Sequence, residues 1–157
     1  MRKQIIADTS SQIAGTQNRW LDVASLAAVQ VSSEAPEHPV EEALEPEGGS
    51  GWRAAAPGPQ TLRLVFDEPQ SLRRIRVRFE ERESERRQEF VLRWSADGAT
   101  FREIVRQQWN FSPSGATSEV EEYAVELSGV AVLELRIIPD MSGGDAHASL
   151  AELRIAD

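Results

Sequence analysis

One stretch of the sequence places an aromatic and an amide side chain next to each other. In QQWNFSPSG, residues 107–115, Trp109 precedes Asn110, and a segment with serine, proline and glycine follows. Proteins commonly hold sugar rings with such a pair, because the aromatic face stacks on C–H groups while the amide makes directional hydrogen bonds. Two other interpretations stay open: Trp109 contacts a second protein chain, since tryptophan is enriched in interface cores, or it packs under its own loop.

A second stretch, EEALEPEGGSGW at residues 41–52, combines glutamates and glycines ahead of a tryptophan. Carboxylates and backbone carbonyls are the oxygen ligands that Ca²⁺ takes, and glycine lets a loop turn its carbonyls inward. A flexible spacer has a similar composition, but Trp52 would then be badly exposed to solvent. We therefore predict a folded loop in which Trp52 plugs the end of the core.

Residues for catalysis are not apparent in the sequence. It has no cysteine, no HExxH or G-x-S-x-G motif, no phosphate-binding glycine loop and no clear histidine-centred triad. Carboxylate pairs are plentiful in an acidic chain, but nothing singles one out. We interpret His38 and His147 as loop residues that make one hydrogen bond each, with a sugar contact as the alternative. We predict that the protein is not an enzyme.

The overall composition indicates a single soluble domain. The 157 residues fit one domain, 1–157, with residues 1–19 as a possible N-terminal strand and polar arm. The net charge of −9 should repel nucleic acid and anionic membranes. No apolar run approaches the roughly 18 residues of a membrane span. Since we find no signal peptide and no cysteine, we expect a cytoplasmic location.

Strands must position these residues, because apolar and polar side chains alternate through most of the chain. Period-two alternation is typical of half-buried strands. The alternating runs are TLRLVF (61–66), SLRRIRVRFEE (71–81), EFVLRW (89–94), YAVEL (123–127), VLELRII (132–138) and LAELRIA (150–156). With no long helical pattern between them, they predict an all-β fold, an antiparallel β-sandwich or jelly roll.

Turn chemistry separates the runs. The pair Asp97-Gly98 predicts a hairpin, and DEPQS (67–71) and ELSGV (126–130) are interpreted as turns between neighbouring strands. Residues 20–32 stay ambiguous, because Asp22 could cap a short helical turn while the end of the segment has the pattern of a strand.

The order of these pieces resembles the discoidin domains, also called coagulation factor V/VIII C-type domains, of the galactose-binding-like superfamily. The resemblance runs from about residue 26 to the end and rests on four segments, VSSEAPEHPVEEAL (31–44), ALEPEGGSGW (43–52), FVLRWSADGATF (90–101) and ASLAELRIA (148–156). It implies a discoidin-like jelly roll. Many such domains bind sugars at loops on one end, and others bind lipid or protein.

The resemblance also implies particular residues. Family members often hold a structural Ca²⁺ in the loop that matches 43–52. In sugar-binding members, an arginine of the loop that matches FEERESERRQE (79–89) often contacts sugar hydroxyls. The matching arginine is Arg82, whose planar fork suits paired hydroxyls. The matching metal ligands are Glu45, Glu47, Ser50 and Glu152. Whether the loop holds a cation or keeps its shape without one is left open.

We therefore expect a non-catalytic binding module that recognises carbohydrate, or a similar hydroxylated ligand, through Arg82, Trp109 and Asn110. The alternative is a protein-interaction or homo-oligomerisation module that uses the same loops. The expected cofactor is a structural Ca²⁺ or none.

Overall fold

Strands predominate among the residues that the structure describes, and both helices there are single turns. The structure is a computed structural model that describes residues 20–45, 50–81, 85–112, 115 and 117–157. The elements are α2 (Val23–Leu26), β1 (Ala27–Val31), α3 (Glu41–Leu44), β2 (Trp52–Pro57), β3 (Gln60–Glu80), β4 (Arg86–Ser95), β5 (Phe101–Phe111), β6 (Ser118–Ile138), β7 (His147–Leu150) and β8 (Glu152–Ala156). Among the described residues, no helix has the length and apolar character needed to cross a membrane.

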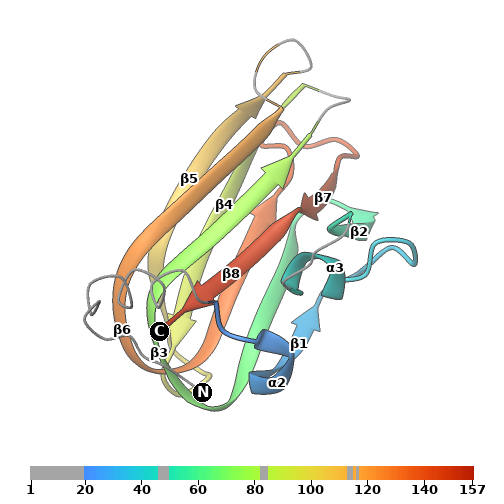
Figure 1. The fold of residues 1–157 in the computed structure, drawn as a ribbon. Coiled ribbons are helices and arrows are strands. Elements are labelled where there is room, and N and C mark those ends of the chain that lie inside the picture. The colour runs from blue at the N-terminus through green and yellow to red at the C-terminus, as the bar shows by residue number, and fades with distance from the viewer. Residues whose placement is uncertain (1–19, 46–49, 82–84, 113–114, 116) are drawn as a thin grey trace, which may run out of the picture.

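Two long strands, β3 and β6, pass from one layer of a sandwich to the other (Figure 1). Residues 60–65 of β3 pair antiparallel with residues 132–137 of β6, where β1 and β4 flank them and β5 adjoins β4. Residues 72–80 pair with residues 118–127, where β8 is the neighbour of β3. β2 and β7 form a separate antiparallel ladder. The predicted antiparallel β-sandwich is confirmed.

The turns expected at 67–71 and 126–130 are absent, and those two predictions were wrong. β3 and β6 run through both segments, and Gln70 pairs with Val130 at the bend. The pairing register shifts there, and Gly129 has a φ of 69°. Proline and glycine in these segments therefore bend two paired strands rather than end them, as in a β-bulge.

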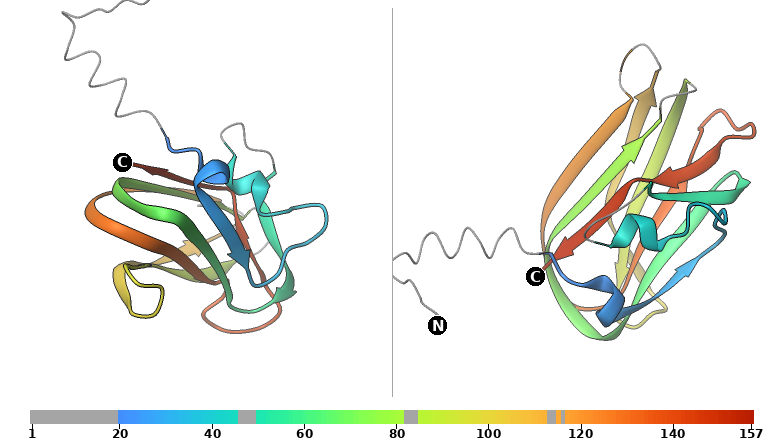
Figure 2. Two further views of the ribbon diagram at one scale, coloured as in Figure 1. Left: turned by 90° about the horizontal axis from the view of Figure 1, so that it is seen from below. Right: turned by 45° about the vertical axis from the view of Figure 1, so that its right-hand side comes forward.

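The core lies between the layers and follows the alternation of the strands. In β3 the fully buried residues change from even positions, such as Leu64 and Leu72, to odd positions, such as Ile75 and Val77, because the register shifts again between Leu72 and Arg74. Phe79 and Phe90 meet across the interior with ring centroids 5.0 Å apart. Burying each such side chain contributes about 1.5–3 kcal/mol. Figure 2 shows the strands curving around this interior.

Trp52 is buried at the end of the predicted loop, as expected, and residues 46–49 of that loop lie outside the described residues. Trp52 is 1% exposed, and its Nε1 donates to the carbonyl of Ser33 over 3.0 Å. Residues 20–32 contain both expected elements, α2 and β1, although Asp22 at the N-cap makes no side-chain hydrogen bond to the helix. The last predicted strand is divided at Ala151 into β7 and β8.

The β4–β5 hairpin forms at the predicted place. Ser95 pairs with Phe101 across it, and the Asp97 carboxylate accepts from the backbone N–H groups of Ala99 and Thr100, both over 2.8 Å. These bonds lower the pKa of Asp97 to about 2. Gly98 takes a positive φ of 81°, which glycine adopts without steric cost.

Candidate functional site

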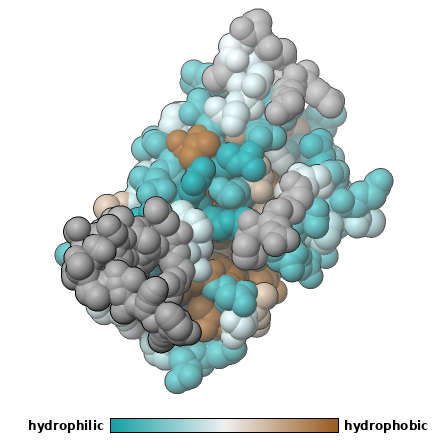
Figure 3. Space-filling model, in the orientation of Figure 1, coloured by the Kyte–Doolittle hydropathy of each residue, from teal (hydrophilic) through white to brown (hydrophobic). Residues whose placement is uncertain are grey.

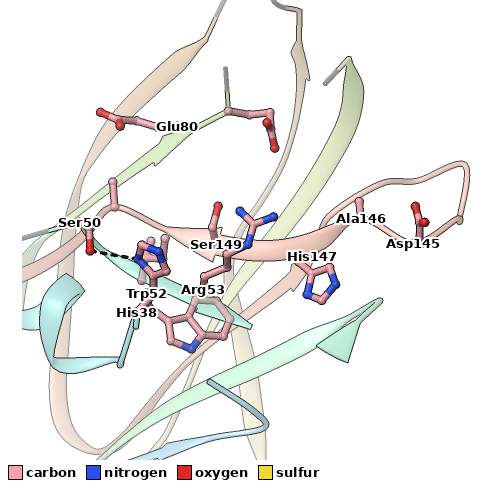
Figure 4. Close-up of a pocket in the computed structure, with 12 residues that line it drawn as sticks. His38, Ser50, Trp52, Arg53, Glu80, Asp145, Ala146, His147 and Ser149 are labelled. Atoms are coloured by element: carbon pink, nitrogen blue, oxygen red, sulfur yellow. Dashed lines mark hydrogen bonds between the residues drawn. The ribbon is translucent and has the colours of Figure 1, made fainter. Parts of the chain in front are cut away.

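A polar pocket of about 520 Å³ opens beside the β2–β7 ladder and the end of β3 (Figure 4). Polar side chains that line it include His38, Arg53, Glu80, Glu81, His147 and Ser149. They come from the segment after β1, from β2, from the end of β3 and from β7. The floor includes the buried Trp52, so the predicted folded loop helps to shape the pocket.

Arg53 places a positively charged guanidinium group at this pocket. It pairs directly with Ser149 across the β2–β7 ladder, and both side chains point to the pocket side (Figure 4). Its neighbours in sequence, Trp52 and Ala54, are each 1% exposed, so strand alternation turns Arg53 outward. Within the described part of the chain, no ion pair or hydrogen bond occupies the Arg53 guanidinium. Its fork is therefore available to a ligand.

The two histidines add further hydrogen-bonding groups. The Nδ1 of His147 lies 3.0 Å from the carbonyl oxygen of Ala54. Because a carbonyl only accepts, Nδ1 carries the proton, and Nε2 of the neutral ring is left as an acceptor. The Nδ1 of His38 lies 3.0 Å from the Ser50 hydroxyl. Each histidine ring makes the one hydrogen bond that was predicted, but His147 is the first residue of β7 and not the loop residue that was expected. Both rings also line the pocket.

The carboxylates at the end of β3 are already paired. Glu81 accepts from Nε of the buried Arg86 over 2.9 Å, and Glu80 forms an ion pair with Arg78. Burial lowers the pKa of Arg86, against the opposing effect of Glu81. Arg86 also donates to the carbonyl of Pro139 over 2.7 Å, which ties the start of the β6–β7 loop to the pocket. The charge of these two glutamates is thus largely balanced.

Trp109 and Asn110 lie in β5, so the loop predicted at 107–115 is wrong for residues 107–111. As neighbours in a strand they point to opposite sides. Trp109 packs against the core and Asn110 is exposed. The structure brings neither of them into the pocket. Their role in ligand binding stays a prediction, and the packing of Trp109 matches the interpretation in which it contacts its own domain.

The remaining predicted residues have different surroundings. Arg82 and Glu47 lie outside the described residues. The Glu45 side chain is exposed, and the Ser50 hydroxyl contacts His38. Glu152 in β8 forms ion pairs with Arg76 of β3 and Arg154 of β8. The four-residue metal set therefore stays a prediction.

Sequence reasoning missed Arg53 and Ser149. Each falls inside a segment that was recognised, since Arg53 follows Trp52 and Ser149 lies within ASLAELRIA. Their pairing depends on the contact between β2 and β7, which no local pattern reveals. The one usable signal was the single arginine between the apolar Trp52 and Ala54.

Comparison with known proteins gives a fold but no family. No protein-family model and no curated protein matches the sequence. A family 32 carbohydrate-binding module from a family 31 glycoside hydrolase of Clostridium perfringens matches with a TM-score of 0.64 and 18% identity, over 90% of this chain and 97% of that one.

Two further solved modules are similar. A Clostridium perfringens module in complex with GalNAc-β-1,3-galactose matches with a TM-score of 0.62 and 18% identity, over 88% of this chain and 100% of that one. A pectin-binding module matches with a TM-score of 0.60 and 18% identity, over 84% and 91%. These similarities establish the β-sandwich fold of family 32 carbohydrate-binding modules, the galactose-binding-like fold that discoidin domains share.

Proposed function

We propose that the protein is a non-catalytic carbohydrate-binding module that takes a sugar residue into the polar pocket. The observation that carries this proposal is the Arg53 guanidinium, which faces the pocket beside Ser149 without a partner among the described residues. A planar fork of N–H donors matches two neighbouring hydroxyls of a sugar, or the carboxylate of an acidic one.

The other pocket groups suit the same ligand class. The free Nε2 of His147 can accept from a hydroxyl, and the hydroxyl of Ser149 can donate or accept. A sugar ring presents hydroxyls that do both. The pocket is polar and open, which fits a hydrated ligand better than an apolar one.

The solved neighbours favour this class of ligand as well. One was solved with GalNAc-β-1,3-galactose, and another binds pectin. One similar module belongs to a glycoside hydrolase, so a role as the binding part of a larger enzyme fits the same proposal. The finer assignment to discoidin domains and the absence of catalytic activity are parts of this proposal.

A glycan panel followed by calorimetry tests the proposal. The panel contains neutral sugars and uronic acids, and each is measured with EDTA and with CaCl₂. We expect at least one glycan to bind. Arg53→Ala should then weaken its affinity about tenfold or more, since a lost hydrogen bond to a charged group is worth about 1.5–3 kcal/mol. The control is Arg73→Ala, which removes an exposed arginine of β3 outside the pocket.

Two results would overturn the proposal. One is a panel without any binding glycan, and the other is a glycan whose affinity is the same for the wild type and for Arg53→Ala. The alternative of a protein-interaction or homo-oligomerisation module predicts self-association on a sizing column instead. Among the described residues only Val120 and Met141 are large exposed apolar side chains. Figure 3 shows a face that is largely hydrophilic over β8 and β6, with a smaller hydrophobic patch lower on the same face. This surface favours the carbohydrate proposal over the alternative.

A further inference from the structure

The guanidinium of Arg154 reaches from β8 to the end of α3. Its Nη1 donates to the carbonyl of Leu44, the last residue of the helix, over 2.7 Å. Its Nη2 donates to the next carbonyl, that of Glu45. Arg154 is 6% exposed, so both bonds are largely shielded from water.

These bonds satisfy backbone groups that would otherwise lack a partner. The last carbonyls of a helix receive no hydrogen bond from an N–H group of the same helix, and an arginine side chain can donate to them instead. α3 has only four residues, and a helix this short is not stable without contacts to the rest of the fold. The contact also links the segment ahead of the pocket to the closing strand of the sandwich.

Of the residues expected to bind Ca²⁺, Glu45 and Glu152 are described near Arg154, and their surroundings do not fit a metal ion. The Oε1 of Glu152 lies 3.3 Å from Nε of Arg76, and its Oε2 lies 3.5 Å from Nη2 of Arg154. The Glu45 carbonyl already accepts from the same guanidinium. A divalent cation placed among these oxygens would lie next to a fixed positive charge, which like-charge repulsion disfavours strongly in a shielded site.

We propose that Arg154 supplies, from within the chain, the positive charge that this region would otherwise take from a metal ion. The end of α3, at Leu44 and Glu45, is then held to β8 without a metal. This inference goes beyond sugar binding, because it concerns what stabilises the wall of the site. A ligand-free measurement can decide it.

Thermal unfolding of the full chain provides the first test. The midpoint of the wild type should be the same in EDTA and in CaCl₂, because a cation that bound only the folded state would raise it. Arg154→Met should lower the midpoint by about 6–12 °C, since two charge-assisted hydrogen bonds are lost. Arg106→Met is the matched control. It removes an exposed arginine that pairs with Glu89 and Glu103, and it should cost only about 2 °C.

Hydrogen exchange measured by mass spectrometry provides the second test. In Arg154→Met, exchange should accelerate in residues 41–45 and 50–53 but not in the β4–β5 hairpin. Arg154→Lys keeps a charge but lacks the fork, and it should restore only part of the protection.

A wild-type midpoint that rises with CaCl₂ would overturn the proposal, as would an Arg154→Met variant that behaves like Arg106→Met. If Arg154→Met does not fold, the wild-type metal comparison and Arg154→Lys still decide the question. Neither measurement uses a sugar, so a result that contradicts the role of Arg154 can be distinguished from a result that contradicts sugar binding.

Discussion

Replacing Glu134 by glutamine removes a buried carboxylate that two arginines share. On the outer face of the sheet, Glu134 in β6 pairs with Arg63 in β3 and Arg93 in β4. Its oxygens accept from Nε of Arg63 over 2.8 Å and from Nε of Arg93 over 2.7 Å. Both guanidinium groups also lie over the Phe101 ring, 5.4 Å and 4.9 Å from its centroid.

The expected cost follows from these contacts. A hydrogen bond to a charged group contributes about 1.5–3 kcal/mol. The side chains of Arg63 and Arg93 are 41% and 37% exposed, so water still solvates them after the change, and the glutamine carbonyl keeps one bond. We therefore expect Glu134→Gln to lower the free energy of unfolding by about 2 kcal/mol, or the midpoint by about 4–8 °C. Chemical and thermal denaturation both measure this.

The cost should also depend on pH. Burial raises the pKa of Glu134, but hydrogen bonds from Arg93 and Arg63 outweigh burial and hold it below its ordinary value of 4.5. A carboxyl whose pKa is depressed in the folded state stabilises that state above its unfolded pKa and loses this contribution as pH falls. The difference between wild type and Glu134→Gln should therefore be full at neutral pH and shrink below about pH 4.5.

Glu122→Gln is the control, because Glu122 is 43% exposed in its pair with Arg74. It should cost less than about 1 kcal/mol. The reasoning is refuted if Glu134→Gln costs no more than this control, or if its cost does not change with pH.

Two further predictions concern single residues. Gly51→Ala should destabilise the fold by about 2 kcal/mol or more, because Gly51 has a φ of 82° and an added Cβ would lie 2.6 Å from the Leu150 carbonyl oxygen. Gly58→Ala is the control, because Gly58 has a similar φ of 89° but open space around it, so this variant carries the backbone strain without the clash. Equal losses of stability in the two variants would contradict the clash. Tyr123 is the only tyrosine, and burial, followed by the charge of Glu121, raises its pKa to about 12. Tyrosinate absorbance should therefore titrate at about pH 12 in the folded chain and at about pH 10 in denaturant, and the free energy of unfolding should fall as pH rises between these values. A titration midpoint near pH 10 in the folded chain would contradict the burial.

Much of the fold could be predicted because its signals are local. Alternation in 61–66, 89–94 and 132–138 predicted strands, and the structure confirms all three. Only 61–66 buries a single face, because Val91, Val132 and Glu134 are buried as well as their alternating neighbours. The burial of Trp52 was predictable because an aromatic residue of that size is costly to expose beside glycines.

The bends were not predictable from the same kind of signal. Asp67 and Pro69 are turn residues, and the sequence 67–71 suits a turn as well as a bulge. Pairing between Gln70 and Val130 decides between the two, and this pairing is a contact between distant segments.

The site was only partly accessible to sequence reasoning for the same reason. Asn110 was predicted to bind a ligand together with its neighbour Trp109, but adjacent residues of a strand point to opposite sides of the sheet. Arg53 and Ser149 meet only because β2 pairs with β7, and Arg154 reaches α3 only because β8 closes the sandwich.

The most direct test of sugar binding at the pocket is a crystal structure of the chain with the glycan that binds it most tightly. We predict a sugar residue within hydrogen-bond distance of the Arg53 guanidinium, with Ser149 or the Nε2 of His147 as a second contact. A glycan held elsewhere, such as on the exposed face of β5 around Asn110, with Arg53 free of contact, would contradict the account.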